Sequence, residues 1–412
     1  VTVVSTDGEK TPVEPSESSA PSVLPDHQTS SHWYLDEQRA VRERRADASP
    51  RRAKNIVFFL GDGMGVSTVT AARILAGQRL GGTGEEYSLS FEHFPMSGLA
   101  KTYNVNSQTP DSAGTMSAIV TGVKTNISMF GVDETASPED CMSATDRSLL
   151  SLLEIAELAG RSTGVISTAR LTHATPAATY AKTVNRDWED DTAMPEDAAA
   201  AGCSDIATQF VTHRQGMEAR FGAGASDGIE VAFGGGLQHF LPTEEGGSRS
   251  DGVNLIERWE TLNPGGSFVE DSRGLQRVKS APVLGLFADS HMQYQLERAA
   301  PDARQPSLVA MTRKAVELLA QDSDGFFLVV EAGRIDHGHH AGNAANALNE
   351  TVELSDAVAA VMEMVDPKET LVIVTADHSH FFTMAGYPRR GNPILGKVIP
   401  AWSDEPMLDA NG

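Results

Sequence analysis

The chain has 412 residues, which is enough for one large domain or two ordinary ones with a sizeable core. Its 56 acidic and 33 basic residues give a net charge of −23, so its surface repels polyanions and no nucleic-acid-binding surface is expected. No apolar run approaches the roughly 18 residues of a membrane helix, so no membrane span is expected.

Two segments precede the main domain. Residues 1–31 are rich in Ser, Pro and Thr with few large apolar side chains, which predicts a flexible arm. Residues 32–53 begin with HWYLDEQRAVRERRADA, which predicts an N-terminal helix on a surface, followed by a linker. Residues 54–412 are predicted to form the main domain.

From Asn55 onward, short apolar strands alternate with helices. NIVFFL predicts a buried strand, GDGMG a tight turn and VSTVTAARILAG a helix, and helix–strand pairs follow at 148–169, 306–333 and 348–380. This alternation predicts an α/β fold, in which a doubly wound, mainly parallel sheet carries helices on both faces as a three-layer sandwich. The Gly- and Ser-rich stretch at about 234–274 interrupts the alternation and is predicted to be an insertion.

Four predicted strands end in residues that can bind metal ions, and ligands of such sheets collect at the carboxyl ends of strands. These residues are Asp62, His173, Thr175, Glu331, Asp336, His340, Asp377 and His378. Each motif by itself is more typical of a turn or a cap than of a ligand. Their coincidence at four strand ends indicates a metal centre.

The spacing of these residues also favours particular ions. Asp336 and His340 are four residues apart, so both project from one face if the segment is helical, and they can then hold one ion. Sets that combine carboxylate and imidazole suit Zn²⁺, whereas sets of carboxylates and hydroxyls, such as Asp62, Thr175 and Glu331, suit Mg²⁺.

A candidate nucleophile lies in TPDSAGTMSAIVTG, residues 109–122. Ser112 follows Pro and Asp and precedes small residues, a pattern that is usually a helix N-cap. The structural and the catalytic interpretation are compatible, because a helix N-terminus favours both an attacking alkoxide and an incoming anion.

Taken together, these motifs resemble the alkaline phosphatase family. The similarity runs from about Lys54 to the end of the chain, through LGDGMGVSTVTAARILAG, KTYNV, PDSAGT, THATPAATYAKTVNR, VEAGRIDHGHHAG and VTADHSH in the order of the family. The resemblance implies hydrolysis of phosphate monoesters to alcohol and inorganic phosphate at alkaline pH. It also implies a phosphoserine intermediate, two Zn²⁺ ions, one Mg²⁺ ion and a homodimer.

Motif by motif, the resemblance also implies the roles of single residues. Ser112 would be the nucleophile and a ligand of the second zinc, and Arg186, in TVNRDW, would bind two phosphate oxygens. The metal ligands would be Asp336 and His340 for the first zinc, Asp62, Asp377 and His378 for the second zinc, and Asp62, Thr175 and Glu331 for magnesium.

Four further positions indicate the animal-type branch of the family. His173 and His337 would lie just outside the magnesium ligands, and Cys141 and Cys203 fall where that branch has a disulfide. A disulfide implies an oxidising compartment, so a periplasmic or secreted protein is expected. Only nine of the 33 basic residues are Lys. The net charge of −23 together with the low Lys content fits either a salt-adapted, halophilic bacterial protein or an ordinary acidic protein from a GC-rich genome.

The sequence departs from the family pattern at two places. The third ligand of the first zinc is a His in a C-terminal motif of the family, but all twelve histidines here lie at or before His380. We therefore expect a C-terminally truncated chain, in which the first zinc is bound weakly. Ala288 replaces the glutamate of the calcium site found in animal-type members, so that site is not predicted.

Three alternatives stay open at this point. A sulfatase of the same superfamily would need X-Pro-X-Arg after its nucleophile, whereas Ser112 precedes Ala-Gly-Thr. A phosphodiesterase or a metal-dependent mutase would lack the paired DSAG and DHGHH motifs. A non-catalytic zinc- or phosphate-binding protein would keep the ligands without turnover.

Overall fold

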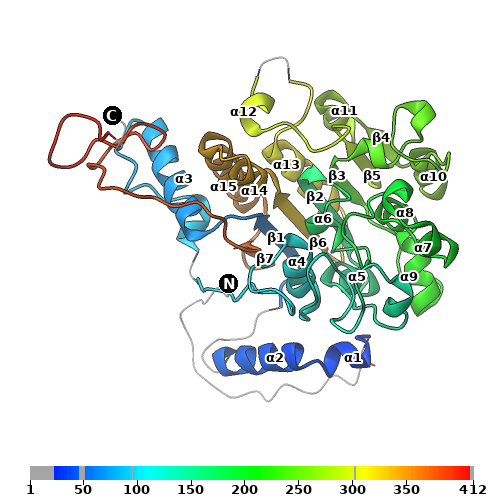
Figure 1. The fold of residues 1–412 in the computed structure, drawn as a ribbon. Coiled ribbons are helices and arrows are strands. Elements are labelled where there is room, and N and C mark those ends of the chain that lie inside the picture. Colours follow the sequence, from blue (N-terminus) through cyan, green and yellow to red (C-terminus); the bar gives the residue numbers. More distant parts are fainter. Residues whose placement is uncertain (1–22, 46–51, 95, 301–302, 409–412) are drawn as a thin grey trace.

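The computed structural model describes residues 23–45, 52–94, 96–300 and 303–408. Seven parallel strands form one sheet in the order β4-β5-β3-β2-β6-β1-β7. They span β1 Asn55–Gly61, β2 Ser162–Arg170, β3 Val231–Gly235, β4 Ser267–Val269, β5 Val283–Leu286, β6 Phe326–Ala332 and β7 Thr370–Ala376. Helices cover both faces (Figure 1), so the predicted α/β class and the doubly wound parallel sheet are confirmed.

Both faces of the sheet are buried because its strands are apolar on both sides. Along β1, Phe58 and Leu60 belong to one hydrophobic core, and Val57 and Phe59 belong to the other. This alternation is the period of two expected for a strand, and it explains why a central parallel strand reads as an unbroken apolar run.

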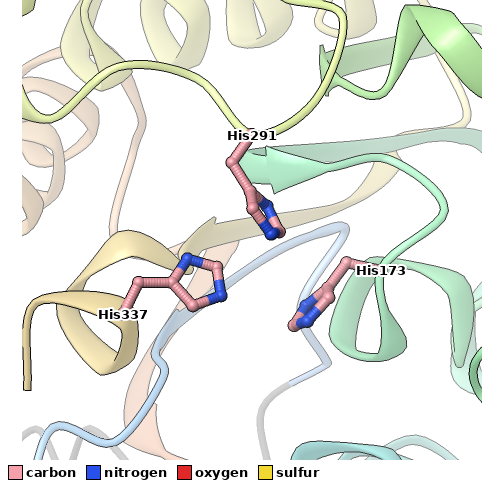
Figure 2. A group of neighbouring side chains, drawn as sticks. All are labelled: His173, His291 and His337. Atoms are coloured by element: carbon pink, nitrogen blue, oxygen red, sulfur yellow. The ribbon is translucent and has the colours of Figure 1, made fainter. Parts of the chain in front are cut away.

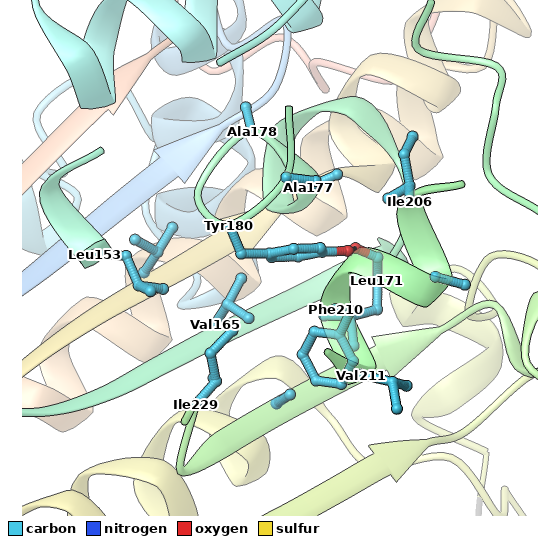
Figure 3. Close-up of a cluster of buried hydrophobic side chains, with 14 of the residues drawn as sticks. Leu153, Val165, Leu171, Ala177, Ala178, Tyr180, Ile206, Phe210, Val211 and Ile229 are labelled. Carbon is cyan, nitrogen blue, oxygen red and sulfur yellow. Dashed lines mark hydrogen bonds between the residues drawn. The ribbon is translucent and has the colours of Figure 1, made fainter. Parts of the chain in front are cut away.

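The helices divide between these two cores. The first core packs against α4 Ser112–Thr121, α5 Leu152–Leu158, α6 Ala174–Ala177, α8 Ile206–Val211 and α10 Leu255–Leu262. Figure 3 shows part of it, where the ring of Tyr180 lies among apolar side chains and its hydroxyl donates to Leu171 O at 2.9 Å. The second core packs against α11 Ser272–Arg277, α13 Leu308–Leu319, α14 Arg334–His340 and α15 Ala344–Met364, and α3 Val66–Arg79 packs on α15.

Further helices complete the described chain. The remaining α-helices are α1 Asp26–Thr29, α2 His32–Arg45, α7 Glu196–Ala200, α9 His213–Phe221 and α12 Gln295–Arg298, and the 3-10 helices are Ser90–His93, Cys141–Ala144, Asp191–Ala193, Leu237–His239 and Thr243–Glu245. None of the helices in the described ranges is long and apolar enough to cross a bilayer. Cys141 and Cys203 are joined as a disulfide in this structure.

The N-terminal segments differ in part from the expectation. Residues 1–22 and 46–51 lie outside the described residues, but α1 forms within the expected flexible arm. Gln28 of α1 is buried, and its amide donates to Thr121 O at 2.6 Å and to Leu150 O at 3.1 Å. Residues 26–29 of the expected arm are therefore helical, and Gln28 is anchored to the main domain. The segment 234–274 contributes the edge strand β4, and its origin as an insertion stays a prediction.

Candidate metal centre

The carboxyl ends of three neighbouring strands bring candidate ligands together. Strands β6, β1 and β7 lie side by side, and Leu60 of β1 pairs with Glu331 of β6 and with Thr375 of β7. Asp62 and Asp377 follow just beyond these pairs. Because the strands are parallel, the three carboxylates emerge at one edge of the sheet.

Ser112 is the first residue of α4 and faces this edge. The helix is capped by Asp111, whose Oδ1 accepts from Gly114 N at 3.1 Å. Ser112 Oγ donates to Asp62 Oδ1 at 3.1 Å and lies 3.3 Å from His378 Nε2. The hydroxyl is therefore held between a carboxylate and an imidazole, in the field of a helix N-terminus.

Asp377 and His378 are fixed in orientation by their neighbours. Asp377 Oδ2 accepts from Thr115 Oγ1 at 3.1 Å. His378 Nδ1 lies 2.9 Å from Ser379 O, which can only accept, so Nδ1 carries the proton and Nε2 presents a lone pair. That lone pair lies 3.4 Å from Asp62 Oδ1, and such an arrangement of two unprotonated ligand atoms suits a cation.

Helix α14 carries Asp336 and His340 on one face, as their spacing predicts. His340 Nε2 lies 3.2 Å from Asp336 Oδ2. His380, which was not predicted as a ligand, joins them with its Nε2 3.3 Å from Asp336 Oδ1. That contact lacks hydrogen-bond geometry, so Asp336 Oδ1 is buried without a hydrogen-bond partner within the described ranges. The three side chains form a compact group of potential ligands.

A third group lies around Glu331. This carboxylate is fully buried, and its Oε2 accepts from Ser167 Oγ. Glu331 Oε1 and Thr175 Oγ1 are buried without hydrogen-bond partners in the part of the chain that the structure describes. Asp62, His173 and Glu331 each place a ligand atom within 4.8 Å of the others. Carboxylate and hydroxyl oxygens in this arrangement fit magnesium.

Within the described residues, the carboxyls of Asp62, Asp336 and Glu331 are buried without a Lys or Arg ion-pair partner, and their pKa values are raised. Burial raises the pKa of Asp62 well above its ordinary value, and the neighbouring carboxylates of Asp377, Asp336 and Glu331 raise it further. Burial likewise raises the pKa of Asp336, and it raises the pKa of Glu331 to about 8. Divalent cations would remove this penalty, which together with the unpartnered oxygens shows that the donor set fits metal ions.

Arg186 connects the serine to a cluster of histidines. Its Nη1 donates to Asp111 Oδ2 at 3.1 Å, and its Nη2 donates to His173 Nε2, also at 3.1 Å. His173 lies close to His337, and a third imidazole, His291, joins them. Burial, with the neighbouring arginines and histidines, lowers the pKa of His173 well below its ordinary value, that of His337 to about 3 and that of His291 to about 2.

Two residues of the site were missed from the sequence, for different reasons. His380 lies two residues after His378 in ADHSH, a position that could have suggested a second imidazole at the same strand end. His291 lies in the loop after β5 and belongs to no ligand motif, so only the folded chain brings it to the other histidines.

An α/β sheet that gathers buried carboxylates, imidazoles and a serine at a helix N-terminus at its strand ends is typical of metal-dependent hydrolases. The family model for alkaline phosphatase matches residues 53–408, and the chain therefore belongs to the alkaline phosphatase family. The chain is an enzyme that hydrolyses phosphate monoesters, and the family favours metal cofactors. The sulfatase, phosphodiesterase and non-catalytic alternatives are not supported.

Individual relatives agree with this assignment. The chain is 42% identical over 392 residues to the tissue-nonspecific alkaline phosphatase of Gallus gallus, covering 90% of this chain and 73% of the relative. The structure of Thermus thermophilus alkaline phosphatase matches with a TM-score of 0.67 and 26% identity, covering 90% and 67% of the two chains. The structure of a mutant alkaline phosphatase of the Antarctic bacterium TAB5, with magnesium bound, matches with a TM-score of 0.60 and 25% identity. The match covers 81% of this chain and 80% of the TAB5 chain.

Proposed function

We propose that hydrolysis proceeds through a phosphoserine on Ser112, at a site that holds two Zn²⁺ ions and one Mg²⁺ ion and works best at alkaline pH. The observation that carries the proposal is the placement of Ser112 Oγ, 3.1 Å from Asp62 Oδ1 and 3.3 Å from His378 Nε2, at a helix N-terminus. The unpartnered oxygens of Asp336, Glu331 and Thr175 belong to the two neighbouring groups of candidate ligands.

The donor atoms suggest how three ions would be shared. Asp336 and His340 would hold the first zinc, with His380 beside them; Asp62, Asp377, His378 and Ser112 would hold the second zinc; Asp62, Thr175 and Glu331 would hold magnesium. The unpartnered oxygens of Asp336, Glu331 and Thr175 support this division. When bound, the ions would lower the pKa of the attacking group and stabilise charge on the attacking and leaving oxygens. The magnesium-bound TAB5 relative supports the third ion.

The protein side chains would carry out nucleophilic attack, bind the phosphate oxygens and orient the surrounding groups. Ser112 Oγ attacks phosphorus, so that an Oγ–P bond forms and the ester P–O bond breaks, and the alcohol leaves. Water then breaks the Oγ–P bond and releases inorganic phosphate. Arg186, which Asp111 holds through Nη1, would bind two non-bridging phosphate oxygens with its planar guanidinium. His173 and His337 would orient groups around the magnesium ligands.

We also propose a cellular location and an assembly state for the enzyme. The disulfide between Cys141 and Cys203 and the resemblance support a periplasmic or secreted homodimer. The net charge of −23 supports a salt-adapted surface.

The phosphoserine is tested with Ser112→Ala. Turnover of a phosphate monoester should fall by at least about a thousandfold, because the variant lacks the attacking oxygen. Acid quenching after incubation with ³²P-labelled substrate should trap label on the wild type and none on the variant.

Ser117→Ala is the matched control. Ser117 lies on the same helix, and its Oγ accepts from Gly131 N at 3.1 Å, away from the candidate ligands. This variant should keep both turnover and label. Turnover of Ser112→Ala at the wild-type rate would refute the covalent scheme.

A further inference from the structure

Three histidines from three separate segments converge beside the metal centre. His173 precedes α6, His291 lies in the loop after β5, and His337 lies on α14. Figure 2 shows the three rings turned toward one another. Their centroids are 5.3 Å apart for His173 and His291, 5.4 Å for His173 and His337, and 4.2 Å for His291 and His337. All three residues are half-buried, so each keeps some exposure to solvent.

The hydrogen-bond partners of the rings determine which nitrogens carry protons. A guanidinium or a backbone amide can only donate, so a ring nitrogen that faces one must accept. Arg334 Nη1 faces His337 Nδ1 at 3.0 Å, and Arg186 Nη2 faces His173 Nε2 at 3.1 Å. His337 Nε2 and His173 Nδ1 are therefore N–H donors.

At His291, two hydrogen-bond donors face each other. The backbone N–H of Arg170 donates to His291 Nδ1 at 3.2 Å, so His291 Nε2 carries the proton. That N–H faces Arg170 Nη1 at 2.6 Å, which is also a donor. Both N–H groups need an acceptor, and within the described residues the other acceptor near Arg170 Nη1 is Ser290 Oγ, at 3.4 Å.

The cluster thus contains donors without matching acceptors. His173 Nδ1 is buried and has no hydrogen-bond partner within the described residues. Arg170 cannot turn away, because its Nε donates to Glu189 Oε2 at 2.8 Å and its Nη2 pairs with the other oxygen. Arg334 is held over the ring of Tyr294, 3.9 Å from its centroid. A fixed set of unmatched N–H donors is suited to an anionic oxygen rather than to a metal ion, which requires lone pairs.

We propose that His173, His291, His337 and Arg170 form a subsite for a second anionic group on the substrate. It would favour monoesters whose alcohol carries another phosphate or a carboxylate. The subsite adjoins the catalytic centre, because Arg186, which would bind the phosphate, also contacts His173. The inference rests on the proposed function of this centre and specifies its substrate class.

The test compares matched substrates on the full-length protein loaded with zinc and magnesium. Propyl phosphate lacks a second anion, whereas the bisphosphates of ethane-1,2-diol, propane-1,3-diol and pentane-1,5-diol carry one at increasing reach. 4-Phosphooxybutanoate distinguishes a carboxylate from a phosphate. The wild type should prefer one bisphosphate to propyl phosphate by about tenfold or more in kcat/KM, because hydrogen bonds to charged groups are strong.

The informative variant is His291→Ala, since His291 is neither a proposed metal ligand nor a proposed contact of the reacting phosphate, and it meets the site only through the rings of His173 and His337. It should remove most of the preference while kcat/KM for propyl phosphate stays unchanged. His291→Gln keeps a donor and should restore part of the preference, and His93→Ala, at an exposed position, should behave as wild type. Hydrolysis of propyl phosphate tests only the proposed function. The preference for a bisphosphate over propyl phosphate tests only the subsite.

Three results would overturn the proposal. One is a wild type without preference for any bisphosphate or for the carboxylate. Another is a preference that His291→Ala leaves intact. The third is elemental analysis in which His291→Ala lowers the number of bound transition-metal ions per chain, because the cluster would then be a metal site.

Discussion

Two groups of acidic side chains in this molecule are neutralised in different ways. Around Arg249 the cation is part of the chain: Nη1 and Nη2 each donate to Asp205 at 3.1 Å, and Nη2 donates to Asp251 Oδ2 at 2.6 Å. At the carboxyl edge of the sheet, the ion-pair partners of Asp62 and Asp336 within the described ranges are histidines only.

This difference appears in the acidity of the carboxyls. Burial raises the pKa of Asp251, but the hydrogen bonds from Arg249, the backbone hydrogen bond from Val253 and the charge of Arg249 together outweigh burial, so the pKa is lowered. Burial raises the pKa of Asp62 well above its ordinary value, and neighbouring carboxylates add to the effect. Acidic groups with their own arginine therefore belong to the scaffold, whereas buried acidic groups without one mark a place for added cations.

The largest effect on stability is expected where the built-in cation is removed. Arg249→Met leaves the buried Asp205 without its partner and should lower the free energy of unfolding by about 3–5 kcal/mol. Urea unfolding measures this loss. Turnover of the folded fraction should be unchanged, because Arg249 contacts no candidate ligand.

An exposed pair provides the control for that variant. Arg214 Nε lies 3.3 Å from Glu218 Oε1 on the surface of α9, and Arg214→Met should change stability by about 0.5 kcal/mol or less. An equal loss of unfolding free energy in Arg249→Met and Arg214→Met would contradict the claim that burial makes the Arg249 ion pair important for stability.

Arg186 lies between the two cases, because Nη1 pairs with Asp111 and Nη2 contacts only an imidazole. Arg186→Ala should weaken binding of inorganic phosphate by about 1.5–3 kcal/mol, measured as competitive inhibition. Arg186→Lys keeps the charge without the planar guanidinium. Its affinity for inorganic phosphate should lie between that of Arg186→Ala and that of the wild type. Unchanged phosphate affinity in Arg186→Ala would contradict a phosphate-binding role.

The smallest effect concerns acidic groups that face each other. Burial and the nearby Glu157 raise the pKa of Glu230 to about 9. The folded state therefore holds a proton that the unfolded state releases near pH 4.3, so stability is lost as pH rises from there toward 9. The effect is small because Glu230 is only half-buried and water screens its charge.

Glu230→Gln removes this titration. The variant should match the wild type in thermal unfolding near pH 5 and be more stable than the wild type near pH 9. Parallel stability profiles for the two proteins over this range would contradict the assignment.

The sequence predicted those parts of the molecule that depend on local pattern. Strand β1 and helix α3 follow from apolar periodicity, and Asp336 and His340 share a face because their spacing matches one helical turn. The convergence of His291 with His337 depends on the path of a loop and on strand order, which no local pattern encodes. The same limit applies to Gln28, whose burial depends on contacts with distant backbone groups.

The central claim is that the buried acidic groups at the strand ends need added divalent ions for function. The direct measurement is hydrolysis of a chromogenic phosphate monoester at alkaline pH, before chelation, after chelation and dialysis, and after zinc and magnesium are restored. The account predicts that activity is lost on chelation and returns only when the ions are restored. Full activity in the protein from which both metals have been removed, verified by elemental analysis, would contradict it.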